Sequence, residues 1–157
     1  MENLRFAAPC LFGIEGIAAD ELRRMGAENV SAEDGRVIFS GDLNMLARAN
    51  INSRFSERIM ILLGEFRAES FTELFDGVKA LPWEDFIGKD DAFPVVGSSL
   101  ASELHSIPDC QSIIKKAVVE RLRQKYAVSW FEETGAEHKI RFSIRKNRVS
   151  ICLDTSG

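Results

Sequence analysis

The sequence has few of the residues that metal sites and nucleotide sites require. It contains three cysteines and two histidines. Their spacing matches neither CxxC nor HExxH, so no zinc site is indicated. There is no GxGxxG loop and no Walker lysine, so dinucleotide and nucleoside triphosphate binding are not supported. We therefore expect a chain without a metal and without a cofactor of its own.

Long apolar runs are also missing. No stretch approaches the ~18 apolar residues of a membrane helix. The start, MENLRFAAPCLFG, has no basic segment leading into an apolar core, so we expect no signal peptide. Cys10, Cys110 and Cys152 are odd in number and far apart, which argues against a disulfide framework and fits a reducing compartment. We expect a cytoplasmic protein with no membrane partner.

Positive charge is scarce overall, but it is concentrated near the end of the chain. The net charge is −4. Residues 1–112 hold 10 Lys and Arg against 19 Asp and Glu, a balance of −9, whereas residues 113–148 hold 10 against 4, a balance of +6. This asymmetry marks the C-terminal third as a candidate anion-binding surface. Composition leaves open whether that segment binds a ligand or is a solvated basic helix and hairpin.

The first part of the chain alternates short strand and helix patterns. Asp34-Gly35 is a strong hairpin signal, Gly26 is placed to end a helix, and Asp42 is placed to begin one. The expected apolar face of that second helix consists of Leu43, Leu46, Ala47 and Ile51. We expect strands at 4–10, 28–33, 36–41 and 57–66 and helices at 13–26 and 42–52. The order β-α-β-β-α-β over residues 1–65 is ferredoxin-like.

The second part begins with a capping-box helix, in which Ser70 precedes Glu73 by three residues. A short helix or turn is predicted at PWEDFI, and a long helix ends near Tyr126. Further strands are expected within 92–106 and at 127–133, 139–144 and 149–154, with the RKNR tip at 145–148 joining the last two. The fold class is α+β, a ferredoxin-like subdomain packed on a second α/β domain.

Two local patterns could carry chemistry. Cys110 near a helix start could be a nucleophile, but it falls on the apolar stripe of that helix, so a buried core residue is the favoured interpretation. The stripe continues through Ile113, Ile114, Ala117, Val118 and Leu122. The G-x-x-G at Gly13–Gly16 resembles a nucleotide-backbone clamp, although such glycines also serve simple tight turns.

The start of the long helix is the remaining candidate. Ser106 or Asp109 can cap it, and its free N–H groups suit a phosphate. Lys115 and Lys116 lie off the apolar stripe, whereas Glu103 would repel a phosphate. The residues leave open a phosphate site and a capped helix with a solvated outer face.

The chain resembles the N-terminal half of the THUMP-containing RNA guanine N2-methyltransferases, a group also labelled N6-adenine-specific DNA methylases. The resemblance covers essentially the whole sequence, and SIPDCQSIIKKA and LDTSG are its most specific segments. It implies a ferredoxin-like domain at 1–65 and a THUMP domain at 66–157. In the family DTSG leads into the catalytic domain, and no S-adenosylmethionine loop or NPPY motif is present here. The resemblance therefore implies a non-catalytic fragment of an S-adenosylmethionine-dependent enzyme.

The family also implies a function and a site. The fragment would bind RNA, with large-subunit rRNA as the expected partner, and position it for guanine methylation. Where relatives carry lysines, this chain has Ser98, Ala101 and Glu103. We therefore expect the cations of the long helix and of the hairpin to make most of the RNA contacts. The implied RNA-binding residues are Ser99, Ser106, Lys115, Lys116, Arg121, Arg145, Lys146 and Arg148. The alternatives are a ferredoxin-like assembly or regulatory module and part of a DNA adenine methylase.

Overall fold

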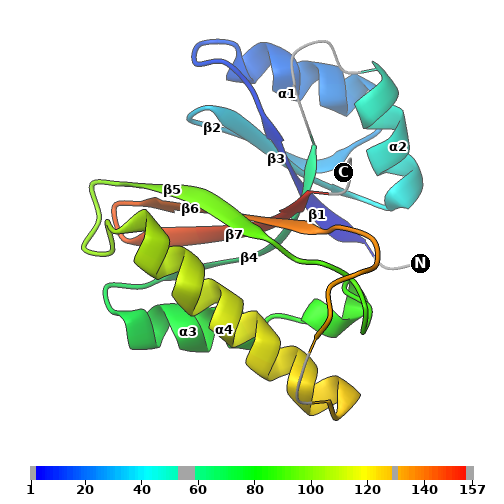
Figure 1. The fold of residues 1–157 in the computed structure, drawn as a ribbon. Helices are drawn as coiled ribbons and strands as arrows, with labels where there is room; N and C mark the ends of the chain where they lie inside the picture. Colours follow the sequence, from blue (N-terminus) through cyan, green and yellow to red (C-terminus); the bar gives the residue numbers. More distant parts are fainter. Residues whose placement is uncertain (1–2, 53–58, 129–130, 155–157) are drawn as a thin grey trace. The chain divides into compact units, whose positions relative to one another are not determined.

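The computed structural model describes residues 3–52, 59–128 and 131–154, which form two compact units. The first unit comprises residues 1–62 and the second comprises residues 63–155, so the chain divides within strand β4. Figure 1 shows the elements of both units as an α+β fold.

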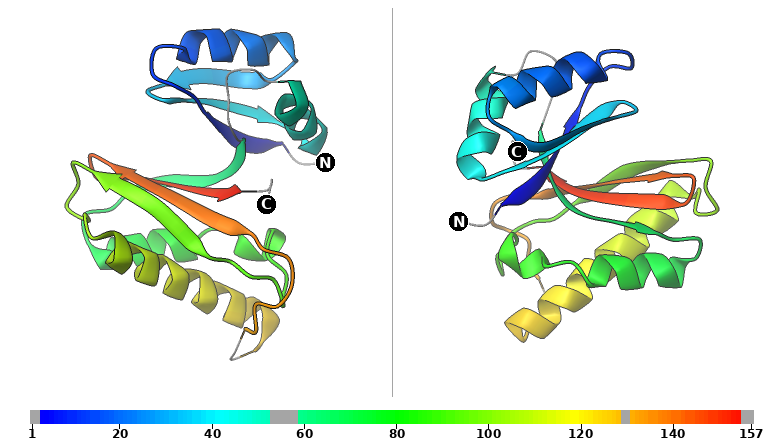
Figure 2. Two further views of the ribbon diagram at one scale, coloured as in Figure 1. Left: turned by 45° about the horizontal axis from the view of Figure 1, so that its top comes forward. Right: turned by 180° about the vertical axis from the view of Figure 1, so that it is seen from behind.

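The first unit has the strand order β2-β3-β1-β4, and all its described pairings are antiparallel. Its elements are β1 (Leu4–Pro9), α1 (Glu15–Arg24), β2 (Glu28–Glu33), β3 (Arg36–Gly41), α2 (Leu43–Asn52) and the start of β4 (Met60–Arg67). Helices α1 and α2 cover one face of these strands (Figure 2). Phe6 of β1 pairs with Phe39 and Ile61 on the two neighbouring strands, and this row forms the centre of the core. The predicted ferredoxin-like order is confirmed.

Short-range signals explain where these elements begin and end. The backbone N–H of Met45 donates to the Asp42 carboxylate at 2.8 Å, so Asp42 caps α2 as predicted. Gly35 in the hairpin turn and Gly26 after α1 both have positive φ, which glycine adopts without strain. The expected face of α2 was partly wrong, because Leu43 and Ala47 are exposed, whereas Met45 and Ala49 are buried with Leu46. The side chain of Ile51 lies outside the described residues.

The second unit has the strand order β4-β7-β6-β5. Its further elements are α3 (Phe71–Lys79), the 3-10 turn η1 (Trp83–Asp85), β5 (Val95–Leu100), α4 (Ile107–Tyr126), β6 (Lys139–Arg145) and β7 (Arg148–Asp154). Strands β5 and β6 are parallel, whereas β6 and β7 form an antiparallel hairpin. Helices α3 and α4 lie side by side on one face of the sheet (Figures 1 and 2).

The core of the second unit lies between that helical layer and the sheet. Alternate residues of β6 are buried in it, as is the apolar stripe of α4. Its largest fully buried side chains are Trp83, Phe93, Leu74, Ile87, Ile114, Leu122, Ile140 and Ile144. The indole of Trp83 donates to the Val78 carbonyl at 2.7 Å, so its one polar atom is satisfied. The Glu73 N–H donates to the Ser70 hydroxyl, which confirms Ser70 as the cap, and the Glu73 carboxylate in turn accepts the N–H of Glu69, one residue before the cap.

One predicted strand is wrong. Among residues 127, 128 and 131–133 the chain has no strand, and residues 129 and 130 of that segment lie outside the described residues. Helix α4 ends at Tyr126, and its C-cap residue Ala127 has a φ of 54°, in the left-handed region. The segment then leads to a single bridge between Ala92 and Glu137. Residues 155–157, the end of the LDTSG motif, also lie outside the described residues.

Candidate nucleic-acid interface

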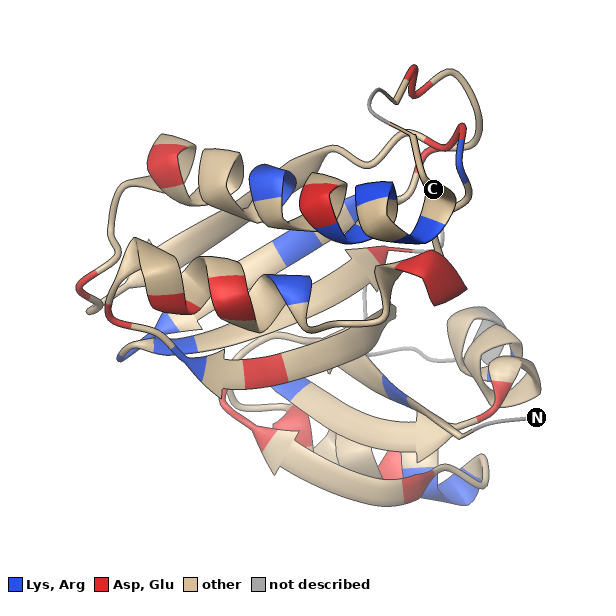
Figure 3. Cartoon of the chain, turned by 90° about the horizontal axis from the view of Figure 1, so that it is seen from below, with Lys and Arg blue, Asp and Glu red and all other residues tan. Residues whose placement is uncertain are grey.

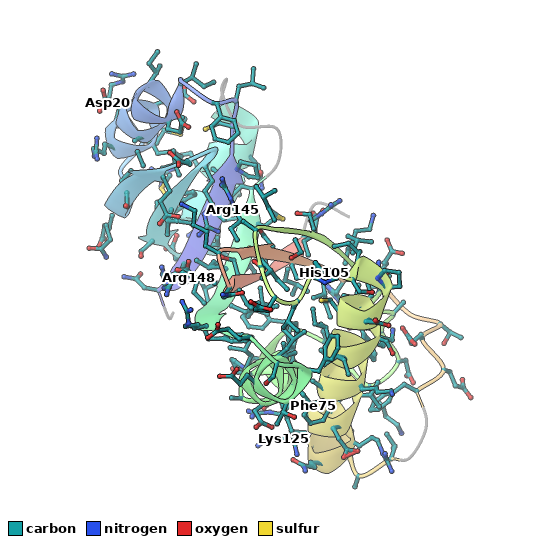
Figure 4. All side chains as sticks on the ribbon, turned by 90° about the vertical axis from the view of Figure 1, so that its left-hand side faces the viewer. Asp20, Phe75, His105, Lys125, Arg145 and Arg148 are labelled. Atoms are coloured by element: carbon teal, nitrogen blue, oxygen red, sulfur yellow. The ribbon has the colours of Figure 1, made fainter. Side chains whose placement is uncertain are left out.

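Four cations gather where strands of the second unit end. Arg145 closes β6, Lys146 lies in the hairpin turn, Arg148 opens β7 and Arg67 closes β4. We call these four residues the basic rim. All four are exposed, and the register places Arg145 opposite Arg148. Figure 3 shows the lysines and arginines of this end, and Figure 4 labels Arg145 and Arg148.

Two carboxylates accompany the basic rim. Arg148 Nε lies 3.8 Å from Glu65 Oε2, and Arg67 Nε lies 3.3 Å from Glu69 Oε2. Both arginine side chains remain more than 60% exposed, so these pairs are worth little and leave the guanidinium groups accessible. Across the ranges that the structure describes, neither Arg145 nor Lys146 forms an ion pair. The four exposed cations of the rim therefore outnumber the two carboxylates paired with it.

The turn itself is a two-residue hairpin. Lys146 and Asn147 have φ values of 51° and 66°, as the type I′ geometry requires at both central positions. This confirms the hairpin tip predicted at 145–148. The turn orients consecutive cations toward the same end of the sheet, because the two strands that it joins run back alongside each other.

The end of β5 lies against this turn. Leu100 pairs with Arg145 across the parallel ladder, and the Lys146 N–H donates to the Leu100 carbonyl at 3.2 Å. The Ser99 hydroxyl donates to the Leu104 carbonyl at 2.6 Å. Ser99, which the sequence suggested as an RNA-binding residue, lies one position before Leu100, the partner of Arg145, and its hydroxyl proton is used within the loop that precedes α4.

The start of α4 differs from the expected cap. Ser106 occupies the N-cap position, yet its side chain makes no capping hydrogen bond, and Asp109 is exposed in the first turn. Cys110 is fully buried, and burial, followed by the charge of Asp109, raises the pKa of its thiol. A raised thiol pKa opposes nucleophilic chemistry, so the core interpretation of Cys110 is confirmed. Ile113 is only half-buried, whereas the rest of the stripe is buried.

In the G-x-x-G turn of the first unit, a carboxylate of the same turn accepts the backbone N–H groups that a phosphate would need. The Glu15 carboxylate accepts the N–H groups of Gly13 and Gly35, both at 2.8 Å. The hydrogen bond from Gly35, followed by those from the helix start, lowers the pKa of Glu15. Because a carboxylate already occupies these donors, the turn is a tight strand-to-helix connection and does not offer these donors to a phosphate.

The two neighbouring lysines of α4 differ. Lys115 Nζ lies 2.7 Å from Glu133 Oε1, 3.0 Å from the Phe93 carbonyl oxygen and 3.8 Å from the centre of the Phe93 ring. Burial alone would raise the pKa of Glu133, but the hydrogen bonds from Lys115 and the Phe93 N–H outweigh it, and the pKa is lowered. Lys116 is exposed. It lies nine residues after the helix start, about 14 Å along the axis.

This difference predicts unequal effects on stability. Lys115→Ala is expected to lower the free energy of unfolding by about 1 kcal/mol, because it removes an ion pair and a cation–π contact that are both partly shielded from water. Lys116→Ala, the matched control, is expected to change it by less than about 0.5 kcal/mol. Urea denaturation of both variants measures the difference. Equal losses would contradict the structural role of Lys115.

Arg121 is also held within the fold. Its guanidinium lies 2.9 Å from Glu84 through both Nε and Nη2, and Nη1 donates to the Lys79 carbonyl. This site joins α4 to the segment after α3 and is 14 residues along α4 from its first residue. The structure thus brings together Ser99, Arg145, Lys146 and Arg148 and separates them from Arg121.

The sequence-based prediction of this site did not include two residues that belong to it. Arg67 joins the basic rim only because β4 neighbours β7. Asn147 makes hydrogen bonds to Ala68, Ser102 and Glu103. Neither role follows from periodicity. The only available signal was the asparagine in a predicted tight turn.

The described residues set two further limits. They include no helix that is long and apolar enough to span a membrane. Within the same described ranges, no cluster of His, Cys, Asp and Glu side chains could hold a metal ion.

Comparisons with known proteins agree with this architecture. The family model described as RlmL ferredoxin-like domain matches residues 5–60, and the THUMP domain model matches residues 68–154. The chain is 43% identical to "Putative RNA methyltransferase YpsC" of Bacillus subtilis over 159 aligned residues, which cover 100% of this chain and 41% of YpsC. It is 29% identical to the "Ribosomal RNA large subunit methyltransferase K/L" of Aeromonas salmonicida, covering 97% of this chain and 21% of the relative.

Two solved structures are similar over nearly the whole chain. One is described as a predicted N6-adenine-specific DNA methylase from Listeria monocytogenes, with a TM-score of 0.94 and 44% identity, covering 98% of this chain and 40% of the other. The other is SMU.472, described as a putative methyltransferase complexed with SAH, with a TM-score of 0.92 and 36% identity, covering 99% and 42%. The chain therefore spans about two fifths of the length of these proteins.

Proposed function

This chain belongs to the THUMP domain family, and on that premise we propose that it is the RNA-binding module of an S-adenosylmethionine-dependent rRNA (guanine-N2) methyltransferase. The first domain would comprise residues 1–65 and the THUMP domain residues 66–157. The methyl transfer would belong to a catalytic domain outside this chain. The names of the relatives and the SAH in the SMU.472 complex support this assignment.

The basic rim is the observation that carries the RNA-binding role. Three of its four cations come from the +6 segment, and one of these, Arg145, pairs with Leu100 at the end of β5. Arginine and lysine groups at the ends of adjacent strands suit the phosphates of a folded RNA, which are recognised by shape and charge more than by base identity. We propose large-subunit rRNA as the partner and the cytoplasm as the location.

The individual residues take different parts in this proposal. Arg145, Lys146 and Arg148 would contact phosphates directly, with Arg67 beside them. Lys116, Ser99 and Ser106 would extend the contact along α4 and its preceding loop. Lys115 and Arg121 would act from within the fold, because their charges are already paired with Glu133 and Glu84.

The salt dependence of RNA binding tests this function. If about three to four phosphates are neutralised, the logarithm of the association constant is expected to fall with the logarithm of salt concentration with a slope of about −2 to −3.6. Fluorescence anisotropy with a labelled rRNA hairpin measures this slope. Binding that does not depend on salt, or no binding at low salt, would overturn the proposal. Competition by duplex DNA at equal strength would favour the DNA methylase alternative instead.

A further inference from the structure

Asn147 connects three segments at the basic rim. Its backbone N–H donates to the Ser102 hydroxyl at 3.0 Å, and its side-chain oxygen accepts the Glu103 N–H at 2.8 Å. Its carbonyl accepts the Ala68 N–H at 2.9 Å. Its side-chain amide reaches Glu69 at 3.4 Å. One residue thus ties the hairpin turn to both the β5–α4 loop and the β4–α3 junction.

These bonds hold a stretch of backbone that contains three residues with positive φ. Ala101, Lys146 and Asn147 all have positive φ, which is costly for side chains other than glycine or asparagine. Asparagine tolerates this conformation and adds side-chain hydrogen bonds. The bonds of Ser102 and Lys146 to the Leu100 carbonyl complete the network around the same turn.

The three tied segments carry the rim cations. Arg67 precedes the Ala68 amide directly, and Arg145, Lys146 and Arg148 surround Asn147. We propose that Asn147 is a positioning residue that holds these four cations as one prearranged phosphate-binding array, so that little ordering is needed when RNA binds. This inference rests on the proposed RNA-binding function. Asn147 carries no charge and would act through its neighbours.

The test changes the arrangement of the rim cations without changing their number. Asn147→Gly keeps a residue that accepts a φ of 66° but removes the side-chain bonds to Glu103 and Glu69. RNA affinity of the 157-residue chain is expected to fall about fivefold to tenfold, the cost of ordering a few groups on binding. The slope of the logarithm of affinity against the logarithm of salt concentration is expected to stay within about half a unit of the wild-type slope, because no cation is lost.

Two comparisons sharpen the result. Asn29→Gly makes the same change at a positive-φ asparagine in the first unit, and it is expected to leave affinity unchanged. Lys146→Gln, in contrast, is expected to reduce the magnitude of the slope by about 0.7 to 0.9, as the loss of one phosphate contact requires. Hydrogen exchange at the Glu103 amide is expected to be faster in Asn147→Gly than in the wild type.

The outcomes distinguish this inference from the proposed function. If the wild type binds RNA and Asn147→Gly binds equally well, the positioning role is overturned and the RNA-binding function stands. A slope change as large as that of Lys146→Gln would also overturn it, because positioning alone leaves the contacts intact. If the wild type binds no RNA, both proposals fail together.

Discussion

Replacing Arg145, Lys146 and Arg148 together with glutamate is expected to reduce RNA affinity at low salt by about 100-fold or more. Each cation accounts for about one phosphate contact, and each reversal adds repulsion to the loss of attraction. The three side chains are exposed at one turn, so their replacement leaves the core of the second unit intact. Anisotropy titration with the labelled hairpin at several salt concentrations gives both the affinity and the slope.

A charge-matched variant provides the control. Arg24, Lys89 and Lys125 are exposed at other places on the chain, and their joint replacement with glutamate changes the net charge equally. We expect the affinity of this control to fall by less than about tenfold, because none of its three replaced residues belongs to the basic rim and solvent and salt screen exposed charges that make no contact with the RNA. Equal losses would mean that net charge governs binding and that the basic rim is not the site. Circular dichroism verifies that both variants are folded.

The sequence correctly predicted the features that depend on short-range patterns. The Asp42 cap, the Ser70–Glu73 box and the 145–148 turn were all correct, because each depends on residues within a few positions of one another. Helical periodicity also placed Cys110 in the core correctly. Such patterns state which face of an element is buried.

Periodicity does not predict which residues distant in the sequence contact the exposed face of a helix. Lys115 and Lys116 both lie off the apolar stripe, yet only Lys115 meets Glu133, 18 positions further along the chain. Arg121 finds Glu84 37 positions earlier, and Arg67 joins the rim through the order of the strands. The charge asymmetry identified the basic segment, but tertiary contacts decided which of its cations remain exposed and which are paired within the fold.

Removal of the Arg121 guanidinium is expected to have the largest effect on stability among the charged residues of α4. Arg121→Ala should lower the free energy of unfolding at neutral pH by about 2 kcal/mol, between the values for exposed and buried ion pairs. Arg121 and Glu84 are each less than a quarter exposed, and the variant leaves that carboxylate without its bidentate partner. Arg123→Ala removes the exposed pair with Glu120 and serves as the control, with an expected loss below about 0.5 kcal/mol.

The pH dependence of this loss identifies its cause. The hydrogen bonds from Arg121 lower the pKa of Glu84 below that of an ordinary carboxyl group. A carboxylate with a depressed pKa in the folded state stabilises the protein above its unfolded pKa of about 4.3 and loses that contribution as the pH falls through the folded value. The difference in the free energy of unfolding between wild type and Arg121→Ala should therefore be largest at pH values above about 5 and should decrease progressively below about 4. Urea denaturation across this range measures the difference, and a difference that stays constant would assign the loss to packing of the arginine stem instead.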